Sequence, residues 1–315
     1  MKILHILEDY SSASGGIRTV VKSLNEKLNR NDEIKSYVIS AAIDENEKVY
    51  KKIDTCRPWL YSSDWIKTIK TVVKEEDINV IHIHGVWMFP QYIAAKFAIK
   101  QGIPFILTPH GMYEPWLWSK GRIKKVLYFK IFTQPFFKKA SIIHAITDNE
   151  RKNLKKLFPK TKIGLIPNLI DVVDYYSSDS KIDKYILFVG RIDKKKGIDI
   201  LIKSFARLKY NNLKLKIAGK YNDYKNELDK LTVDLDISNK VEFLGLIKGK
   251  VKEEVYKNAF VFVAPSHSEV IGMVNLEAAI YGTPVITTFQ TGLNTKWNEN
   301  GGMLINPNEE ELFES

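Results

Sequence analysis

The chain has 315 residues, a hydrophobic fraction of 44% and a formal net charge of +11. This length exceeds one typical domain and predicts two domains of roughly 150 residues, each with an ordinary globular core. The single cysteine, Cys56, excludes an internal disulfide and agrees with a reducing compartment. The first residues do not resemble a signal peptide, and no apolar run reaches the ~18–20 residues of a spanning helix, so we expect a cytoplasmic protein.

Short apolar strands alternate with helical stretches along the first half of the chain, a pattern typical of parallel α/β architecture. We expect strands at residues 3–7, 36–40, 80–84, 105–108, 142–145 and 163–166. The helices between them are expected to begin near Gly16, Asp64, Pro90, Lys120 and Asp148. Asp148 is the predicted N-cap of the last of these helices, which Pro159 closes.

A polar, Ser-rich stretch divides the chain after Pro167-Asn168. It predicts a linker at residues 169–183, between an N-terminal domain of residues 1–168 and a C-terminal domain of residues 184–315. A second β-α series then follows, with strands expected at 185–189, 213–218, 241–244, 260–264 and 284–287. We therefore expect two doubly wound domains that face each other across a ligand-binding cleft.

The stretch from Ala264 to Ala279 leaves an apolar strand, crosses a polar loop and enters a helix near Gly272. A helix start offers unpaired backbone N–H groups and a positive dipole end, where an anion can bind. Glu269 lies in the loop and Glu277 about two turns further on. The two oxygens of a carboxylate suit paired sugar hydroxyls, although two Glu residues at this spacing also occur around many helices.

A second motif follows the strand at 185–189. It is a basic turn bracketed by Gly190 and Gly197 that opens the next helix. Arg191, with its planar fork, and Lys196, as a point charge, can converge on a diphosphate. The alternative is a basic turn that faces solvent, which is the interpretation we favour for the lysines at 194 and 195.

Together these two motifs resemble the retaining glycosyltransferases of family 4, which have the GT-B fold of two facing Rossmann-like domains. The matching pattern is Gly190-Arg191, four residues, Lys196-Gly197, and then Glu269, seven residues, Glu277. Further segments resemble the family in the same order along the chain: Gly15-Gly16, Thr108-Pro109-His110-Gly111, Ile166-Pro167-Asn168 and Tyr281-Gly282-Thr283-Pro284.

The resemblance implies roles for the charged residues of the C-terminal domain. Arg191 and Lys196 would bind the donor diphosphate and stabilise the charge that develops on the leaving group. Glu277 would hold the ribose hydroxyls of the donor, and Glu269 would hold the transferred sugar.

The resemblance also implies roles for backbone groups and for one histidine. The backbone at Gly272, Met273 and Val274 would support the terminal phosphate, and Gly15-Gly16 would bring N–H groups to the diphosphate from the other domain. His110 would lie near the reacting sugar. The alternative interpretation is that His110 is a hydrogen-bonded histidine at a strand end without a role in catalysis.

Three features depart from the family or match another one. Val270 and Ile271 stand where the family usually has Gly and an aromatic residue, and Leu169 replaces an interdomain Gly. Asp234-Leu235-Asp236 matches a metal-binding pattern of the other large glycosyltransferase fold, but its context predicts a surface position.

His82 and His84 share one face of a strand, as a pair of metal ligands does. No third ligand is evident in the sequence, so we expect no metal site. We interpret His84 as a structural residue or one on the acceptor side.

The segment 119–140 contains seven basic residues and no acidic one, interleaved with Phe, Leu, Ile and Tyr. Such a segment suits an anionic membrane surface, and the alternative is a solvated helix face over buried aromatics. The C-terminal end also differs from the family, which continues through further helices after the segment that ends at Pro307, so that roughly 50 residues are expected to be missing after Ser315. We therefore expect the second domain to be incomplete and to leave apolar surface exposed.

The resemblance implies a metal-independent, retaining transfer of a sugar from a UDP- or GDP-sugar to a glycan or lipid-linked acceptor in cell-surface polysaccharide synthesis. No cofactor and no nucleic-acid partner are expected, because no G-x-G-x-x-G follows a strand and no nucleic-acid-binding motif accompanies the basic charge. The alternatives are a nucleotide-sugar epimerase or phosphorylase on the same fold and a non-catalytic scaffold.

Overall fold

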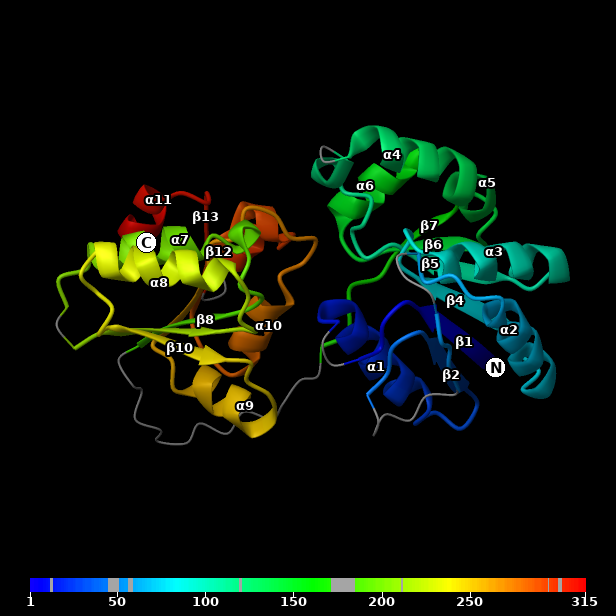
Figure 1. The fold of residues 1–315 in the computed structure, drawn as a ribbon, viewed down its shortest axis with the longest axis horizontal. Helices are drawn as coiled ribbons and strands as arrows, with labels where there is room; N and C mark the ends of the chain where they lie inside the picture. Colours follow the sequence, from blue (N-terminus) through cyan, green and yellow to red (C-terminus); the bar gives the residue numbers. More distant parts are fainter. Residues whose placement is uncertain are drawn as a thin grey trace. The chain divides into compact units, whose positions relative to one another are not determined.

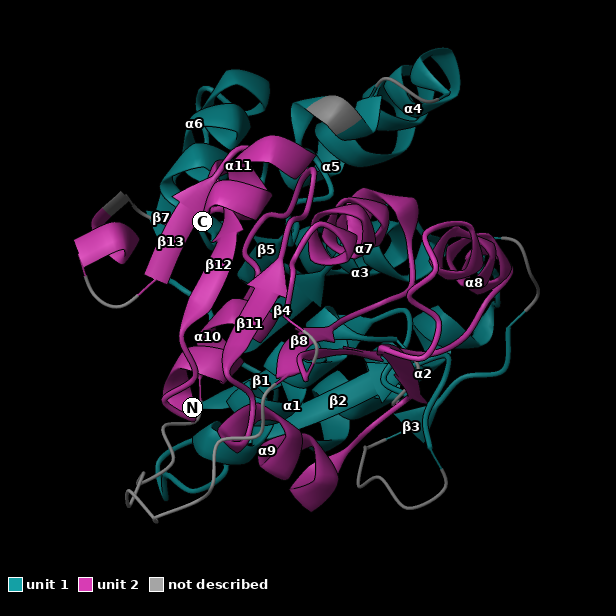
Figure 2. Ribbon diagram, turned by 90° about the vertical axis from the view of Figure 1, so that its left-hand side faces the viewer, with its two compact units in different colours: residues 1–169 teal, residues 170–315 magenta. Residues whose placement is uncertain are grey.

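The computed structural model describes residues 1–11, 14–44, 51–55, 59–118, 121–170, 185–210, 212–293, 295–299 and 302–315. These residues form two compact units, Met1–Leu169 and Ile170–Ser315, which the two views of the ribbon distinguish (Figures 1 and 2). Most of the predicted linker, from residue 171 onward, lies outside the described residues.

Unit 1 is built on a seven-stranded parallel sheet in the order β3-β2-β1-β4-β5-β6-β7. The central strands are buried on both faces, as expected of a parallel sheet covered by helices, which explains their nearly continuous apolar sequences. The strands are β1 Lys2–Leu7, β2 Lys35–Ser40, β3 Lys51–Lys52, β4 Val80–His84, β5 Phe105–Thr108, β6 Ile142–Ala145 and β7 Ile163–Leu165.

Six α-helices accompany this sheet in the described part of unit 1 (Figure 1). They are α1 Gly16–Leu28, α2 Asp64–Glu75, α3 Phe89–Gln101, α4 Arg122–Tyr128, α5 Gln134–Phe137 and α6 Asp148–Leu157. A π-helical turn, Phe129–Thr133, joins α4 to α5. The core gathers around fully buried side chains such as Trp65, Phe105 and Phe137.

Unit 2 has a six-stranded parallel sheet in the order β10-β9-β8-β11-β12-β13. Its strands are β8 Tyr185–Val189, β9 Lys214–Ala218, β10 Val241–Gly245, β11 Val261–Ala264, β12 Val285–Thr288 and β13 Gly302–Ile305. Its helices are α7 Ile198–Ala206, α8 Tyr224–Asp234, α9 Gly249–Lys257, α10 Met273–Ile280 and α11 Glu309–Glu314.

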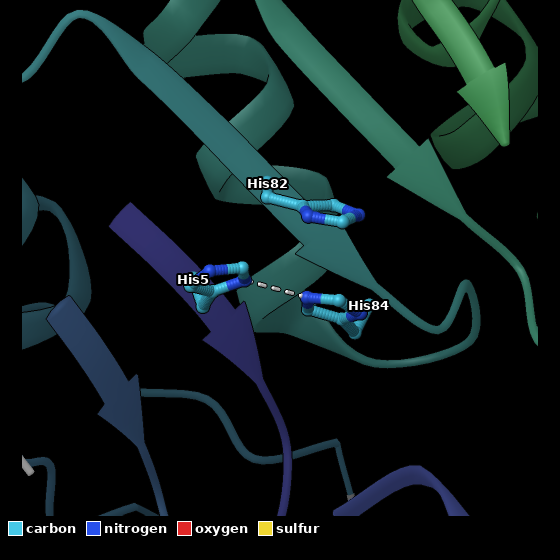
Figure 3. Close-up of side chains that lie close together, drawn as sticks. All are labelled: His5, His82 and His84. Atoms are coloured by element: carbon cyan, nitrogen blue, oxygen red, sulfur yellow. Dashed lines mark hydrogen bonds between the residues drawn. The ribbon is translucent and has the colours of Figure 1, made fainter. Parts of the chain in front are cut away.

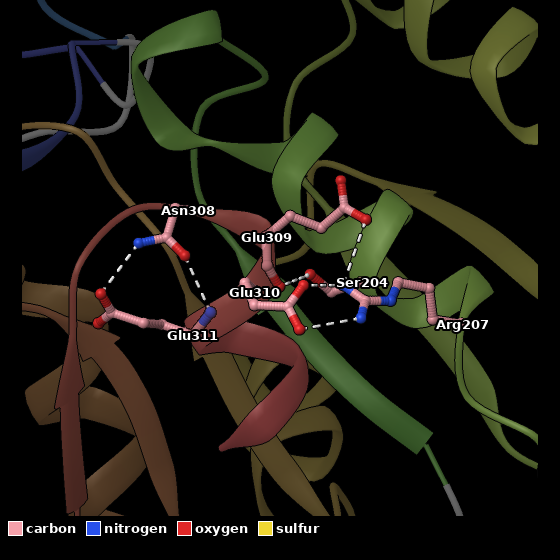
Figure 4. A network of polar contacts seen from close by, with 6 residues as sticks. All are labelled: Ser204, Arg207, Asn308, Glu309, Glu310 and Glu311. Carbon is pink, nitrogen blue, oxygen red and sulfur yellow. Dashed lines mark hydrogen bonds and ion pairs between the residues drawn. The ribbon is translucent and has the colours of Figure 1, made fainter.

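The last helix, α11, is attached to α7 by a polar network (Figure 4). Arg207 donates two hydrogen bonds to the carboxylate of Glu310, at 2.8 and 3.2 Å, and the Ser204 hydroxyl donates to the backbone carbonyl of Glu309 at 3.0 Å. Asn308 caps α11 by accepting from the N–H of Glu311 at 2.9 Å. The ion pair is solvent-exposed, so packing of Leu312 contributes more to this attachment than charge does.

The expectation of two parallel-sheet, Rossmann-like domains is confirmed. The predicted strands are found within one residue at each end, whereas the short edge strands β3 and β13 were not predicted. The N-cap of α6 is Thr147, whose side chain accepts from the N–H of Glu150, so the predicted N-cap at Asp148 is wrong by one residue. Asp234-Leu235-Asp236 ends α8 on the surface, as expected.

None of the helices in the described ranges has the length and apolarity to cross a membrane.

An apolar cavity of about 550 Å³ lies within unit 2, beside α7, β11, β12 and α11. Phe205, Val263, Val285 and Phe313 are among its lining residues. It contains none of the residues predicted to bind the donor or to act in catalysis, so the candidate site lies elsewhere.

Candidate functional site

The basic turn of unit 2 follows β8, whose five residues are all buried. The side chain of Asp193 accepts from the N–H of Lys195 at 2.9 Å and so starts a short 3-10 turn, Lys194–Lys196. Gly197 ends that turn with φ of 66° and begins α7. A Cβ at Gly197 would lie 2.2 Å from the carbonyl oxygen of Pro265, so both the backbone angle and the close approach require glycine here.

This close approach brings the basic turn against the loop after β11. The N–H of His267 donates to the carbonyl of Lys195 at 2.8 Å. The hydroxyls of Thr287 and Thr288 donate to the carbonyls of Ala264 and Ser266, at 2.9 and 2.6 Å, and fix that loop to β12. The two motifs are therefore held together by backbone contacts.

Lys196 and Glu269, 73 residues apart in the sequence, form an ion pair at this junction. Their side chains are only 13% and 17% exposed, so solvent screens the pair less than it screens a surface pair. The structure thus brings together two of the residues predicted to act on the donor.

Lys195 belongs to the same group of charges. Burial lowers the pKa of its ammonium group, and the nearby positive charges of Lys196 and Arg191 lower it further while Glu269 opposes them. Lys195 is partly buried, so it is less solvated than the sequence interpretation expects. Lys194 is solvated as expected, because it is exposed and pairs with Glu227 at 2.8 Å on the surface.

Glu277 lies on α10 and is held through one of its two oxygens. Its Oε2 accepts from the Tyr256 hydroxyl at 3.1 Å and pairs with the ammonium group of Lys252 at 2.7 Å. Within the described part of the chain, Oε1 of Glu277 has no such partner. The carboxylate is therefore oriented and keeps one oxygen for a ligand.

The N-terminus of α10 has no side-chain cap and no acidic residue in its first turn. Gly272 is the N-cap residue, and its N–H donates to the carbonyl of Thr291 at 3.0 Å. A Cβ at Gly272 would lie 2.3 Å from the side-chain nitrogen of Asn275, so a larger residue would displace that buried side chain. No acidic side chain in the first turn of α10 therefore neutralises the positive end of the helix dipole, near Met273 and Val274.

In unit 1, the turn after β5 carries His110 in the left-handed region, with φ of 52°. The buried carboxylate of Glu150 holds this turn: it accepts from the N–H of Gly111 at 2.6 Å and from the N–H of Ile146 at 2.8 Å. Thr147 and Glu150 have the spacing of a capping box, in which the Glu side chain normally returns to the N-cap backbone. Here the carboxylate instead joins the loops after β5 and β6.

His110 is the outer member of a group that contains five of the six histidines of the chain. Its Nε2 lies 3.0 Å from Nδ1 of His84, and Nε2 of His84 lies 2.9 Å from Nδ1 of His5. Burial lowers the pKa of His110 to about 3, so its imidazole is neutral at physiological pH. The ring can donate or accept a hydrogen bond but does not supply a positive charge.

Gly15 and Gly16 begin α1, which also lacks a side-chain cap and an acidic first turn. Gly15 has φ of 82°, and a Cβ at either glycine would meet no atom within 4 Å. Open space around these backbones is compatible with the approach of a ligand, but no contact identifies one.

Known families match nearly the whole chain. A model of Glycosyltransferase Family 4 matches residues 14–174, which is 161 of 315 residues, and a model of Glycosyl transferases group 1 matches residues 177–315. The chain belongs to these glycosyltransferases.

Individual relatives agree with this membership. An uncharacterized glycosyltransferase of Methanocaldococcus jannaschii is 27% identical over 93% of this chain and 82% of that protein. The O-antigen chain mannosyltransferase of Salmonella typhimurium is 26% identical over 73% of this chain and 69% of its own length. The solved structure of Anabaena HepE in complex with UDP and glucose has a TM-score of 0.76 over 100% of this chain and 88% of that chain, at 19% identity, which shows the shared GT-B fold.

Two polar residues that hold the surroundings of His110 were not predicted from the sequence. Glu150 carries no signal beyond its capping-box spacing from Thr147, and that spacing does not reveal its contact with Gly111, 39 residues away. His5 lies in the first strand, and only the pairing of β1 with β4 brings it beside His82 and His84.

Proposed function

We propose that this glycosyltransferase moves a sugar, with retention of configuration, from a UDP- or GDP-sugar to a glycan or lipid-linked acceptor in cell-surface polysaccharide synthesis. The observation that carries the proposal is the junction of the two motifs in unit 2. There Lys195, Lys196 and Glu269 meet in a partly buried position beside Arg191.

The basic residues of this junction suit the donor diphosphate. Arg191 can donate two parallel hydrogen bonds to phosphate oxygens, while Lys195 and Lys196 add point charges. Negative charge develops on the diphosphate as the bond to the sugar breaks, and fixed cations stabilise that charge most when they are already positioned. Because these side chains supply the positive charge, we propose that transfer requires no metal ion at the diphosphate.

The two carboxylates of the motif suit the hydroxyl groups of the donor. Oε1 of Glu277 is oriented by the contacts that Oε2 makes, and it would accept from a ribose hydroxyl. Glu269 would accept from hydroxyls of the transferred sugar while Lys196 turns to the diphosphate. The backbone around Gly272, Met273 and Val274 at the start of α10 would support the terminal phosphate through its dipole and the N–H of Val274, because the N–H groups of Gly272 and Met273 already donate to the carbonyls of Thr291 and Ile271.

Retention and the remaining roles rest on the resemblance of the motifs. The resemblance implies a same-face displacement in which the leaving phosphate takes the acceptor proton. Neutral His110 would hydrogen-bond a sugar hydroxyl near the reacting carbon, and the backbone at Gly15-Gly16 would approach the diphosphate. The glucose and UDP in HepE, and the mannosyl transfer in the name of the Salmonella relative, support a hexose donor and a glycan acceptor.

The α4 region supports a peripheral position on the inner face of the cell membrane. Ile123, Leu127 and Ile131 are 84%, 58% and 51% exposed at a spacing of four residues, and Arg122 and Lys124 beside them are exposed as well. An exposed apolar stripe flanked by basic residues is typical of an interfacial helix. Phe129 and Phe137, by contrast, are buried, which agrees for these two residues with the alternative of a helix over buried aromatics.

A donor screen followed by a transfer assay tests the proposal. Thermal stabilisation by UDP- and GDP-sugars identifies the donor, and incubation of the chosen donor with lipid-linked or oligosaccharide acceptors then measures transfer. A nucleotide-sugar epimerase would instead turn over the donor without an acceptor, and a phosphorylase would require inorganic phosphate. A protein that binds the donor but transfers to no acceptor would be the non-catalytic scaffold.

A further inference from the structure

Three histidines of unit 1 gather on one face of the sheet (Figure 3). His5 on β1 and His82 on β4 are paired in the parallel register, and His84 follows two residues along β4, so all three side chains leave the same face. One nitrogen from each ring lies within 4.8 Å of the other two, and all three residues are buried.

The hydrogen bonds of His82 determine which of its nitrogens carries the proton. Nε2 of His144 lies 2.7 Å from the carbonyl oxygen of Ile166, which can only accept, so the proton of neutral His144 is on Nε2. Nδ1 of His144 must then accept from the Thr108 hydroxyl at 3.0 Å, and the Thr108 oxygen in turn accepts from Nε2 of His82 at 2.7 Å. Nδ1 of His82 is therefore unprotonated and carries a lone pair. It has no hydrogen-bond partner in the described ranges.

The other two rings form an incomplete chain of hydrogen bonds. Nδ1 of His84 is bonded to His110, and its Nε2 is bonded to Nδ1 of His5. Nε2 of His5 is buried without a partner, so the five rings do not satisfy one another. Burial is the first cause that lowers the pKa values of His5, His82 and His84, and neutral imidazole is the form that binds metals.

We propose that His5, His82 and His84 bind one transition-metal dication, with zinc as the reference ion. Imidazole nitrogens suit zinc, nickel and copper, whereas calcium and magnesium need oxygen ligands that this group does not supply. The outer nitrogens of two ligands are already held from outside the triad, by Thr108 and by His110, which is the second-shell arrangement that orients metal-binding histidines.

The geometry requires a small adjustment. Zinc–nitrogen bonds of ~2.0–2.1 Å in a tetrahedral site separate the ligand nitrogens by about 3.3 Å. The nitrogens of the triad, which lie within 4.8 Å of one another, would move closer, and the ion would replace the 2.9 Å hydrogen bond between His5 and His84. Burial disfavours the charge of a bound dication, just as it disfavours an imidazolium ion. A hydroxide ligand at the open fourth coordination position would lower the net charge of the site and so favour metal binding. The site consists of unit 1 residues alone, none of which was predicted to bind the diphosphate. It departs from the expectation of no metal site because β1 supplies the third ligand.

Metal titration of the untagged, full chain tests the site without any sugar nucleotide, so its failure is distinguishable from failure of the proposed function. A Cys56→Ser background removes the one thiol that would compete for zinc. We expect one zinc per chain by chelator competition, and visible absorption bands of a low-coordinate site when cobalt replaces zinc. His5→Gln, His82→Gln and His84→Gln should each weaken binding at least about tenfold, and Thr108→Val should weaken it by about tenfold through His82.

His267→Gln is the matched control, because His267 is the one histidine outside the group and is exposed. It should leave both zinc affinity and stoichiometry unchanged. If a triad variant does not fold, X-ray absorption of the wild-type zinc complex replaces it, with three imidazole ligands expected. Three results would overturn the proposal: weak zinc binding without a defined stoichiometry, a zinc coordination shell with fewer than two imidazoles, or loss of zinc binding in His267→Gln.

Discussion

The ammonium group of Lys196 contacts the carboxylate of Glu269, which joins the basic turn after β8 to the loop after β11. Both side chains are largely buried. Each motif therefore needs the opposite charge of the other to hold its own charge in this partly buried position. A donor that enters this site must therefore share Lys196 with Glu269 or separate the two.

Lys196→Ala should weaken donor binding at least about tenfold, because a charge-assisted hydrogen bond contributes about 1.5–3 kcal/mol and Glu269 would be left unpaired near the diphosphate. Calorimetric titration with the donor measures the change. Lys194→Ala is the control in the same turn, since Lys194 pairs with Glu227 on the surface. Equal losses in both variants would show that only general positive charge matters.

Glu150 should make the stability of unit 1 depend on pH. Burial raises the pKa of its carboxyl to about 7, above its ordinary value near 4.5. The folded state then holds a proton that the unfolded chain releases, so this contribution to stability is complete below about pH 4.5 and is lost as the pH rises through 7.

Glu150→Gln should therefore destabilise the protein more at pH 5 than at pH 8, by about 1–3 kcal/mol of difference in the free energy of unfolding. Chemical denaturation of both proteins at the two pH values measures this. The same destabilisation at both values would mean that the carboxyl titrates alike in the folded and unfolded states.

The exposed stripe on α4 should mediate vesicle binding. Replacement of Ile123 and Leu127 by serine should reduce sedimentation with anionic vesicles at least about tenfold, because each buried aliphatic side chain contributes about 1.5–3 kcal/mol. Binding should also fall as salt screens the basic residues. Val233→Ser with Leu246→Ser, two exposed apolar residues of unit 2, is the control pair. Retained binding of the α4 variant would exclude this surface.

Transfer should continue in EDTA at an undiminished rate. In the proposed mechanism Arg191 and the lysines would supply the charge at the diphosphate, and the hydrogen bond between His84 and His110 needs no metal ion. Initial rates with and without EDTA, and with added magnesium or manganese, measure this. Loss of transfer in EDTA with recovery on manganese would contradict the proposed handling of the diphosphate.

The strands of both sheets could be predicted from sequence because each is a short apolar run bounded by polar residues, as Tyr185–Val189 shows. β3 has only two exposed lysines and carries no such signal. The N-cap of α6 was predicted at Asp148 because Asp and Thr are both good caps, and only the hydrogen bond from Glu150 to Thr147 separates them.

The charged motifs of the site could be found in the sequence, but their contacts could not. The ion pair of Lys196 with Glu269 depends on Gly197 packing against Pro265, a tertiary contact. The environment of Lys195 depends on the same contact, which is why its burial was missed. His5 and Glu150 act through partners on other strands and loops, and the register of the sheet decides those partners.

The most direct test of the central claim is calorimetric titration of UDP- and GDP-sugars into the wild type, Arg191→Ala and Glu277→Ala. The account predicts one donor site per chain, a loss of affinity of at least about tenfold in each variant, and slower transfer in Arg191→Ala. Donor affinity that is unchanged in both variants would contradict the assignment of the unit 2 motifs to the nucleotide sugar.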